Sequence, residues 1–118
     1  MATRRAVLGK DYVDRKEKAK SRFDADFQAF ITDVAWGKVW SRPGLSKRDR
    51  SLITVALLAA LGHAEELDLH IRATRNTGAT MEEIREALLH VAVYAGIPAA
   101  NRAFRVAKQA LAELGLKP

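Results

Sequence analysis

The sequence has no cysteine and only three prolines among its 118 residues. The lack of cysteine excludes a disulfide framework, a thiolate zinc site, an iron–sulfur cluster and thiol chemistry. It also fits a reducing compartment, so we expect a cytoplasmic protein. No segment has the long, charge-free apolar run of a membrane helix, and none follows the basic N-terminus. We therefore expect a soluble protein that does not bind or cross a membrane.

Acidic residues are the scarcer charged type, with 14 Asp and Glu against 20 Lys and Arg and a net charge of +6. A basic patch would indicate nucleic acid, because cations that neutralise phosphates release counterions. Here the basic residues are spread along the chain with acids between them, and there is no arginine-rich arm. The pattern is typical of solvated helix faces and leaves cations for an anionic small molecule. We expect no nucleic-acid partner.

Alternating strand patterns and internal repeats are also missing, which predicts an all-α fold. The 48% of hydrophobic residues suffices for a core, so we expect a single domain over residues 1–118. Apolar residues spaced by three and four predict about six helices. Residues 1–10 lack a clear period and contain Gly9, which predicts an arm or loop there.

Boundary signals divide the expected helices. Pro43 and Gly44 predict a turn after the amphipathic segment 24–40. Ser46 and Thr80 each precede an acid by three residues, which is the pattern of a helix N-cap. The run SLITVALLAALG that follows Ser46 is apolar all the way round. It therefore predicts a helix that is buried on every side.

The stretch LGHAEELDLHIRA at 61–73 places His63, Glu66 and His70 on one helix stripe, because spacings of three and four return to the same face. These three residues are possible metal ligands. However, the spacing differs from H-E-x-x-H, and about 10 Å of helix rise separates the histidines, so we expect no metal site. Glu66 and His70 form either an ordinary surface pair or a desolvated proton-transfer pair. In the second case the carboxylate raises the His pKa and burial lowers it, and the residues alone leave both possibilities open.

Several motifs in one order resemble the gamma-carboxymuconolactone decarboxylase family of the alkylhydroperoxidase D-like superfamily. Peroxidase members of that superfamily carry C-x-x-C-x-x-x-H, whereas this chain has His63 and Glu66 at the cysteine positions and His70 at the histidine. The missing thiols favour the decarboxylase branch. The motifs that carry the resemblance are RRAVLG at 4–9, YVD at 12–14, F-x-x-x-I-T-x-x-A-W-G-x-x-W at 27–40, RPGL at 42–45, RSLIT at 50–54, E-L-x-L-H-x-R-A at 66–73 and Y-x-G-I-P-A-A-N at 94–101.

The resemblance implies an alkylhydroperoxidase D-like helical bundle and a carboxy-lyase that needs no cofactor. The implied substrate is the lactone dicarboxylate 4-carboxymuconolactone, which loses carbon dioxide to give 3-oxoadipate enol-lactone in protocatechuate catabolism. The resemblance also implies a homo-oligomer, commonly a hexamer. The alternative is a non-catalytic or differently specific member of the same fold that acts on or binds another anionic small molecule.

The resemblance assigns catalysis to His70, as proton donor or oxyanion donor, with Glu66 orienting the ring and adjusting its pKa. Arg42 and Arg50 are the candidates for anchoring a substrate carboxylate, which a guanidinium binds in bidentate fashion. The remaining candidates for the substrate pocket are Trp40, Tyr94 and His63, with Trp36 and Trp40 expected mainly to pack in the core.

Overall fold

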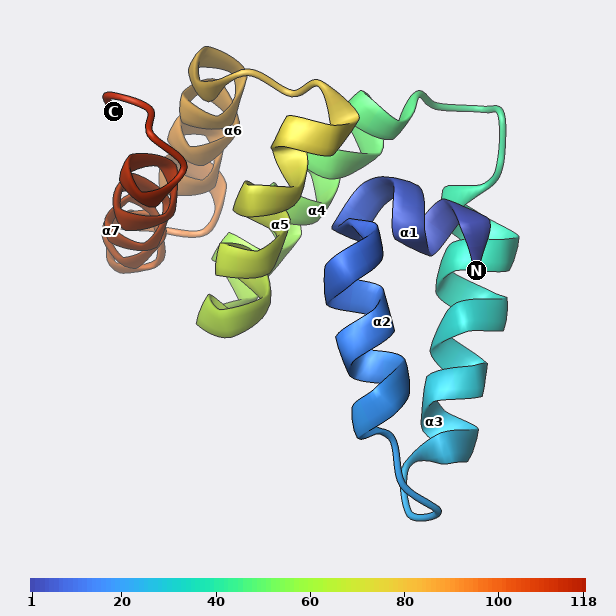
Figure 1. Ribbon diagram of the computed structural model, residues 1–118. Coiled ribbons are helices and arrows are strands. Elements are labelled where there is room, and N and C mark those ends of the chain that lie inside the picture. Colours follow the sequence, from blue (N-terminus) through green and yellow to red (C-terminus); the bar gives the residue numbers. More distant parts are fainter.

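A computed structural model describes residues 1–118, and every regular element in it is a helix, which confirms the all-α prediction. Figure 1 shows α4 to α7 packed together, with α1, α2 and α3 forming a second group beside them. None of the helices has both the length and the apolar character needed to cross a membrane. The elements are α1 (Ala2–Leu8), α2 (Lys10–Ala19), α3 (Ala25–Phe30), the π-helix η1 (Ile31–Trp40), α4 (Lys47–Leu61), α5 (Ala64–Thr77), α6 (Met81–Tyr94) and α7 (Ile97–Glu113).

The prediction of an arm or loop over residues 1–10 is wrong, because residues 2–8 form α1. Gly9 adopts a φ of 95° and separates α1 from α2, so it marks a junction between two helices. Two turns of helix are too short to show a period, and the buried side of α1 includes Arg4 as well as Val7 and Leu8. This helix raises the number of α-helices from the expected six or so to seven.

The buried side chains form two clusters. The larger cluster joins α4 to α7 and contains 12 buried residues, among them Val55, Ile71 and Leu88. The smaller cluster joins α1, α2, η1 and α5, and its 6 buried residues are Val7, Leu8, Val13, Trp36, Trp40 and Ala73. Because α5 contributes to both clusters, it is the helix that connects the two groups seen in Figure 1.

Helix ends follow the predicted signals. The Ser46 hydroxyl accepts a hydrogen bond from the Asp49 amide at 3.0 Å. Thr80 and Glu83 form a reciprocal capping box, with bonds of 3.1 and 2.9 Å. Gly62 ends α4 in the left-handed region at a φ of 78°. The predicted turn at 41–46 and the capped helices after it are confirmed.

Segment 24–40 is helical as predicted, but its second half is a π-helix, η1, which the sequence did not predict. The Ser41 hydroxyl donates to the Trp36 carbonyl at 2.6 Å and so satisfies one carbonyl near the end of η1. π-helical turns are rare and are often found at functional sites. Here η1 carries both tryptophans of the chain.

The helix α4 is not buried on every side, contrary to the prediction. Val55 and Ala59 are buried, but Ile53, Leu57 and Leu61 have 47%, 56% and 67% of their surface exposed. These three leucine and isoleucine side chains are spaced by four residues and form one stripe along the helix. We call Ile53, Leu57 and Leu61 the α4 stripe; in the monomer nothing covers it.

Candidate active site

The candidate site residues at the start of α5 and within it lie at different depths. His63 is the residue before the first turn of α5, and Glu66 lies within that turn. Both are exposed, whereas His70 is partly buried one turn further on. The stripe predicted from the sequence therefore runs from the surface to the smaller cluster, and only His70 reaches the cluster.

His70 packs against the two tryptophans of η1. Its ring centroid lies 6.4 Å from that of Trp36, with 12° between the planes, and 6.2 Å from that of Trp40, with 20° between the planes. The two indoles lie 5.1 Å apart and are 5% and 8% exposed. Offset, nearly parallel rings attract one another and restrict each other's rotation. The indoles therefore hold the imidazole in place.

Burial determines the protonation state of His70. The apolar and aromatic surroundings lower the pKa of the imidazole from 6.5 to about 4, because they disfavour the charged form. The Glu66 carboxylate acts in the opposite direction, through its charge and not through a hydrogen bond. Of the two effects that the sequence left open, burial is the larger, so His70 is neutral at pH 7.

The two nitrogens of His70 differ in their surroundings. Nδ1 is enclosed and has no hydrogen-bond partner. Burying a donor without an acceptor is rarely tolerated, and a buried lone pair is tolerated somewhat better. We therefore assign the ring proton to Nε2. In this tautomer the neutral ring presents one N–H donor away from the enclosed side.

Arg42 and Arg50 meet at the turn before α4. A guanidinium nitrogen of Arg50 donates to the Arg42 carbonyl at 3.1 Å, and the Arg42 side chain is exposed. Nε of Arg50 is enclosed without a partner, and neither guanidinium forms an ion pair within the chain. The two candidate anchors thus hold charge that no carboxylate of this chain neutralises.

Tyr94 does not join the three packed rings. It lies at the end of α6, is 83% exposed, and packs against His90 with ring centroids 5.7 Å apart. The structure therefore brings Trp40 and His70 together and places Tyr94 and His63 on the exposed surface.

Trp36 packs in the core as expected, because it is 5% exposed within the smaller cluster, and its ring also lies 6.4 Å from that of His70. One buried charged group of α1 was not predicted from the sequence. Arg4 is 4% exposed and donates to the Thr32 hydroxyl at 3.3 Å and to the Gln28 side chain at 3.2 Å. The four-residue spacing of the tryptophans indicates that both lie on one helix face. Nothing in the sequence distinguishes Arg4, which is buried, from the other basic residues, most of which are exposed.

Neither a cluster of metal ligands nor a surface hollow offers an alternative location for the predicted site residues. No three His, Asp or Glu side chains lie close enough together to hold one ion. A groove of about 750 Å³ between α6 and α7, and a hollow of about 380 Å³ where α6 meets Leu52, contain none of the predicted site residues. We place the candidate chemistry at His70, because a partly buried imidazole with a lowered pKa is a stronger sign of function than the size of a hollow.

The fold and the site together describe an all-helical, cysteine-free chain in which a neutral imidazole packs against two indoles and keeps one N–H donor. Residues 25–109 match the carboxymuconolactone decarboxylase family. The chain belongs to this family, and the resemblance predicted from the sequence is confirmed.

Similar proteins of known name include two decarboxylases. The 4-carboxymuconolactone decarboxylase of Acinetobacter baylyi is 46% identical over 118 residues, which cover 100% of this chain and 88% of that protein. Nitrosuccinic acid decarboxylase npaB of Metarhizium robertsii is 41% identical over 111 residues, 94% of this chain and 78% of that protein. An uncharacterized 15.0 kDa protein of Paracoccus denitrificans is 28% identical over 98 residues, 81% of this chain and 73% of that protein.

Proposed function

We propose that this chain is a 4-carboxymuconolactone decarboxylase that forms 3-oxoadipate enol-lactone in protocatechuate catabolism, in the cytoplasm. The observation that carries the proposal is the 46% identity to the Acinetobacter baylyi enzyme along the whole chain. The absence of cysteine agrees with it, because thiol peroxidase chemistry is excluded.

The reaction needs an electron acceptor, which the substrate itself provides. When the bond from the ring carbon to its carboxylate breaks, carbon dioxide leaves and the electron pair enters the ring. The lactone carbonyl is conjugated with that carbon through the ring double bond, so negative charge grows on the carbonyl oxygen. A proton then adds to the carbon next to the carbonyl, which gives the enol-lactone. The protein has to stabilise the oxyanion and direct the proton.

His70 is suited to stabilising this oxyanion. In the proposed role its Nε2–H donates a hydrogen bond to the lactone oxygen, and the bond strengthens as charge accumulates there. Trp36 and Trp40 hold the ring, so little reorganisation is needed during the reaction. A neutral donor also avoids trapping the dianionic substrate as a tight ground-state ion pair.

Glu66 adjusts His70 through its charge. Its carboxylate opposes the effect of burial on the His70 pKa, and the approach of a dianionic substrate acts in the same direction. In the proposed step His70 keeps its Nε2–H on the oxyanion, because the enclosed Nδ1 cannot take up a second proton from water. A water molecule then gives its proton to the ring carbon, and the hydroxide that remains combines with the released carbon dioxide to form bicarbonate.

Arg42 and Arg50 are the proposed anchors for the substrate carboxylates, since both guanidinium groups lack an ion-pair partner in the chain. Trp40 forms one wall of the substrate pocket in this proposal. His63 and Tyr94 are exposed and contribute from the rim or across a subunit boundary.

We also propose a homo-oligomer, in keeping with a hexamer. The α4 stripe supports this, because three large apolar side chains in a row are rarely left in water by a protein that works as a monomer. Leu89 and Val93 on α6 are likewise 48% and 75% exposed. In the proposed oligomer, neighbouring subunits that cover these apolar surfaces would also shield exposed candidate substrate-binding residues such as His63 from water.

The test is to mix the purified protein and a chelator with freshly prepared 4-carboxymuconolactone and follow the lactone absorbance. We expect turnover well above the spontaneous rate, and nitrosuccinate serves as a comparison substrate. His70→Gln should lower kcat by about 100-fold or more while changing KM little, since an oxyanion donor acts in the transition state. Glu66→Gln should have a smaller effect. Decay of the lactone at the spontaneous rate would disprove the assignment.

A further inference from the structure

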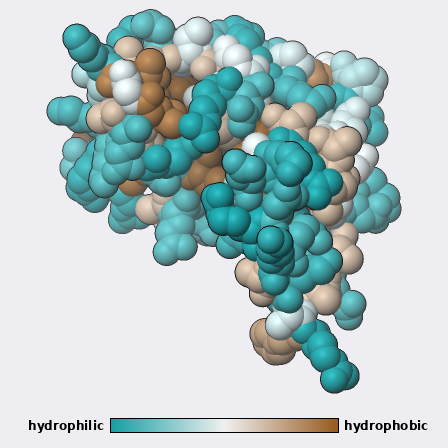
Figure 2. Space-filling model, in the orientation of Figure 1, coloured by the Kyte–Doolittle hydropathy of each residue, from teal (hydrophilic) through white to brown (hydrophobic).

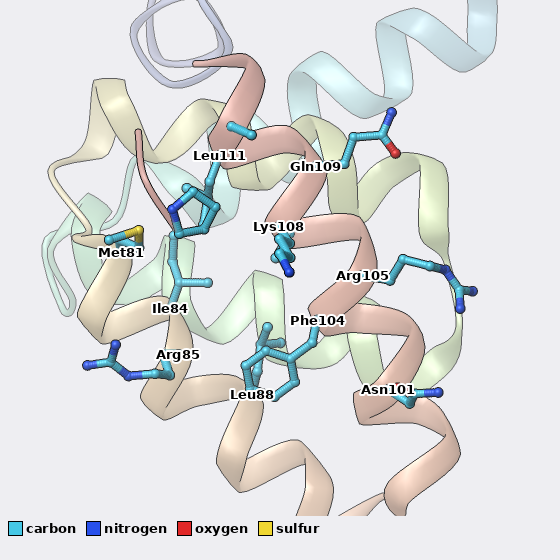
Figure 3. A pocket seen from close by; sticks show the side chains of 13 residues that line it. Met81, Ile84, Arg85, Leu88, Asn101, Phe104, Arg105, Lys108, Gln109 and Leu111 are labelled. Atoms are coloured by element: carbon cyan, nitrogen blue, oxygen red, sulfur yellow. The ribbon is translucent and has the colours of Figure 1, made fainter. Parts of the chain in front are cut away.

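A groove between α6 and α7 lies apart from the His70 site. Its volume is about 750 Å³, which is in the range of small-molecule sites. The floor is formed by Ile84, Leu88 and Leu111 of the larger cluster and by the partly buried Phe104. Figure 3 shows Leu88 and Phe104 close together between the two helices, so the groove reaches down to the core.

The rim of the groove is basic. Arg85 comes from α6 and Arg105 and Lys108 from α7, and all three are exposed. Figure 3 shows Lys108 over the middle of the groove, with Arg85 and Arg105 on its opposite flanks and their guanidinium groups directed outward. None of the three forms an ion pair in the chain, and no Asp or Glu lines the groove. The outer view in Figure 2 shows apolar surface between hydrophilic side chains on this side of the molecule.

We propose that this groove is a binding site for an amphipathic organic anion, with an alkyl or aryl body on the apolar floor and a carboxylate among the three cations. The apolar body supplies most of the affinity by leaving water, and the unpaired cations select for negative charge through charge-assisted hydrogen bonds. Long Arg and Lys side chains reach across such a rim by rotation about their flexible stems.

The lining favours a small anion over a second copy of this chain as the occupant. A second copy would have to place acids of its own opposite three unpaired cations, whereas the carboxylate of a small amphipathic anion meets them directly. The site is also distinct from the proposed active site, because neither tryptophan and none of the predicted catalytic or substrate-binding residues lines it. The proposal therefore stands or falls independently of the decarboxylase assignment.

Calorimetric titration with octanoate, and with 1-octanol as a neutral probe of similar length, tests the proposal. We expect saturable octanoate binding at least tenfold tighter than octanol binding, and weaker binding as salt is raised. The double variant Arg105→Glu with Lys108→Glu should lose at least tenfold in octanoate affinity. The control Arg75→Glu with Lys47→Glu has the same net charge, changes exposed cations outside the groove, and should bind octanoate within twofold of the unaltered protein.

Three outcomes would overturn the proposal. Equal affinity for octanoate and octanol, or equal loss in the two double variants, would show that the rim does not select for charge. A lower sedimentation mass of the Arg105→Glu, Lys108→Glu variant alone would show that another subunit occupies the groove. A change in tryptophan fluorescence that octanoate causes, and that His70→Gln abolishes, would place the ligand at His70 instead.

Discussion

The imidazole of His70 stacks on the indole of Trp40, with 6.2 Å between ring centroids and 20° between planes. Trp36, the second of the two tryptophans in the chain, lies 6.4 Å from the same ring. All of the tryptophan fluorescence therefore comes from the wall of the candidate active site. The protonation of one histidine can be followed through it without a label.

Tryptophan fluorescence should fall as pH is lowered, with a midpoint near pH 4, because an imidazolium in contact with an indole quenches it. The midpoint follows from burial, which lowers the His70 pKa from 6.5 to about 4. A pH titration of the native protein by fluorescence checks this. His70→Gln should abolish the transition, and a midpoint near 6.5 would contradict the burial of the ring.

The same burial makes stability depend on pH. Because the folded pKa lies below the unfolded one, the unfolded chain binds the proton more readily between pH 6.5 and 4. The shift of the His70 pKa therefore contributes about 3 kcal/mol to the free energy of unfolding above pH 6.5. This contribution is lost as the pH falls through 4. Urea unfolding at pH 7 and pH 4 measures it. His70→Gln should lose less stability than the unaltered protein over this interval, and an equal loss would contradict the prediction.

Arg4 ties the helix that carries the tryptophans to the N-terminus. Arg4→Met should lower the free energy of unfolding by about 1–3 kcal/mol, because it leaves the Thr32 hydroxyl and the Gln28 amide oxygen without their donor. It should also weaken the near-ultraviolet circular dichroism of the indoles on η1. Arg4→Lys keeps the charge but not the planar fork, so it should recover only part of the loss. Unchanged spectra would show that Arg4 does not position η1.

The sequence predicted the turn at 41–46 and the helix caps after it, but it missed the short helix α1, the π-helical form of η1 and the tertiary contacts. Ser46 and Thr80 could be recognised because an N-cap depends on residues three positions away. The aromatic contact of His70 could not, since Trp36 and Trp40 are about thirty residues distant and their packing depends on how η1 lies against α5. For the same reason the pKa of His70 was left open between an acid that raises it and a burial that the sequence cannot measure.

Thr80→Ala should lower the free energy of unfolding by about 1 kcal/mol, because it removes the acceptor for the Glu83 amide at the start of α6. Glu83 also pairs with Arg48 of α4, so the effect reaches the contact between α4 and α6. Chemical denaturation measures the change. Thr80→Ser keeps the hydroxyl and should be nearly neutral, and an equal loss in both variants would assign the effect to the methyl group instead of the cap.

Leu57→Glu should dissociate the proposed oligomer. Leu57 lies in the middle of the α4 stripe with 56% of its surface exposed, so the monomer accommodates a carboxylate there without strain. In an assembled interface the same charge is buried without a partner, which costs several kcal/mol per contact. Sedimentation should therefore show the unaltered protein at a multiple of 13.0 kDa and the variant near that mass. Leu116→Glu, at a tail position 47% exposed, makes the same chemical change outside the stripe and should leave the assembly intact. If Leu57→Glu keeps the mass of the unaltered protein, the α4 stripe is not the surface at which subunits meet.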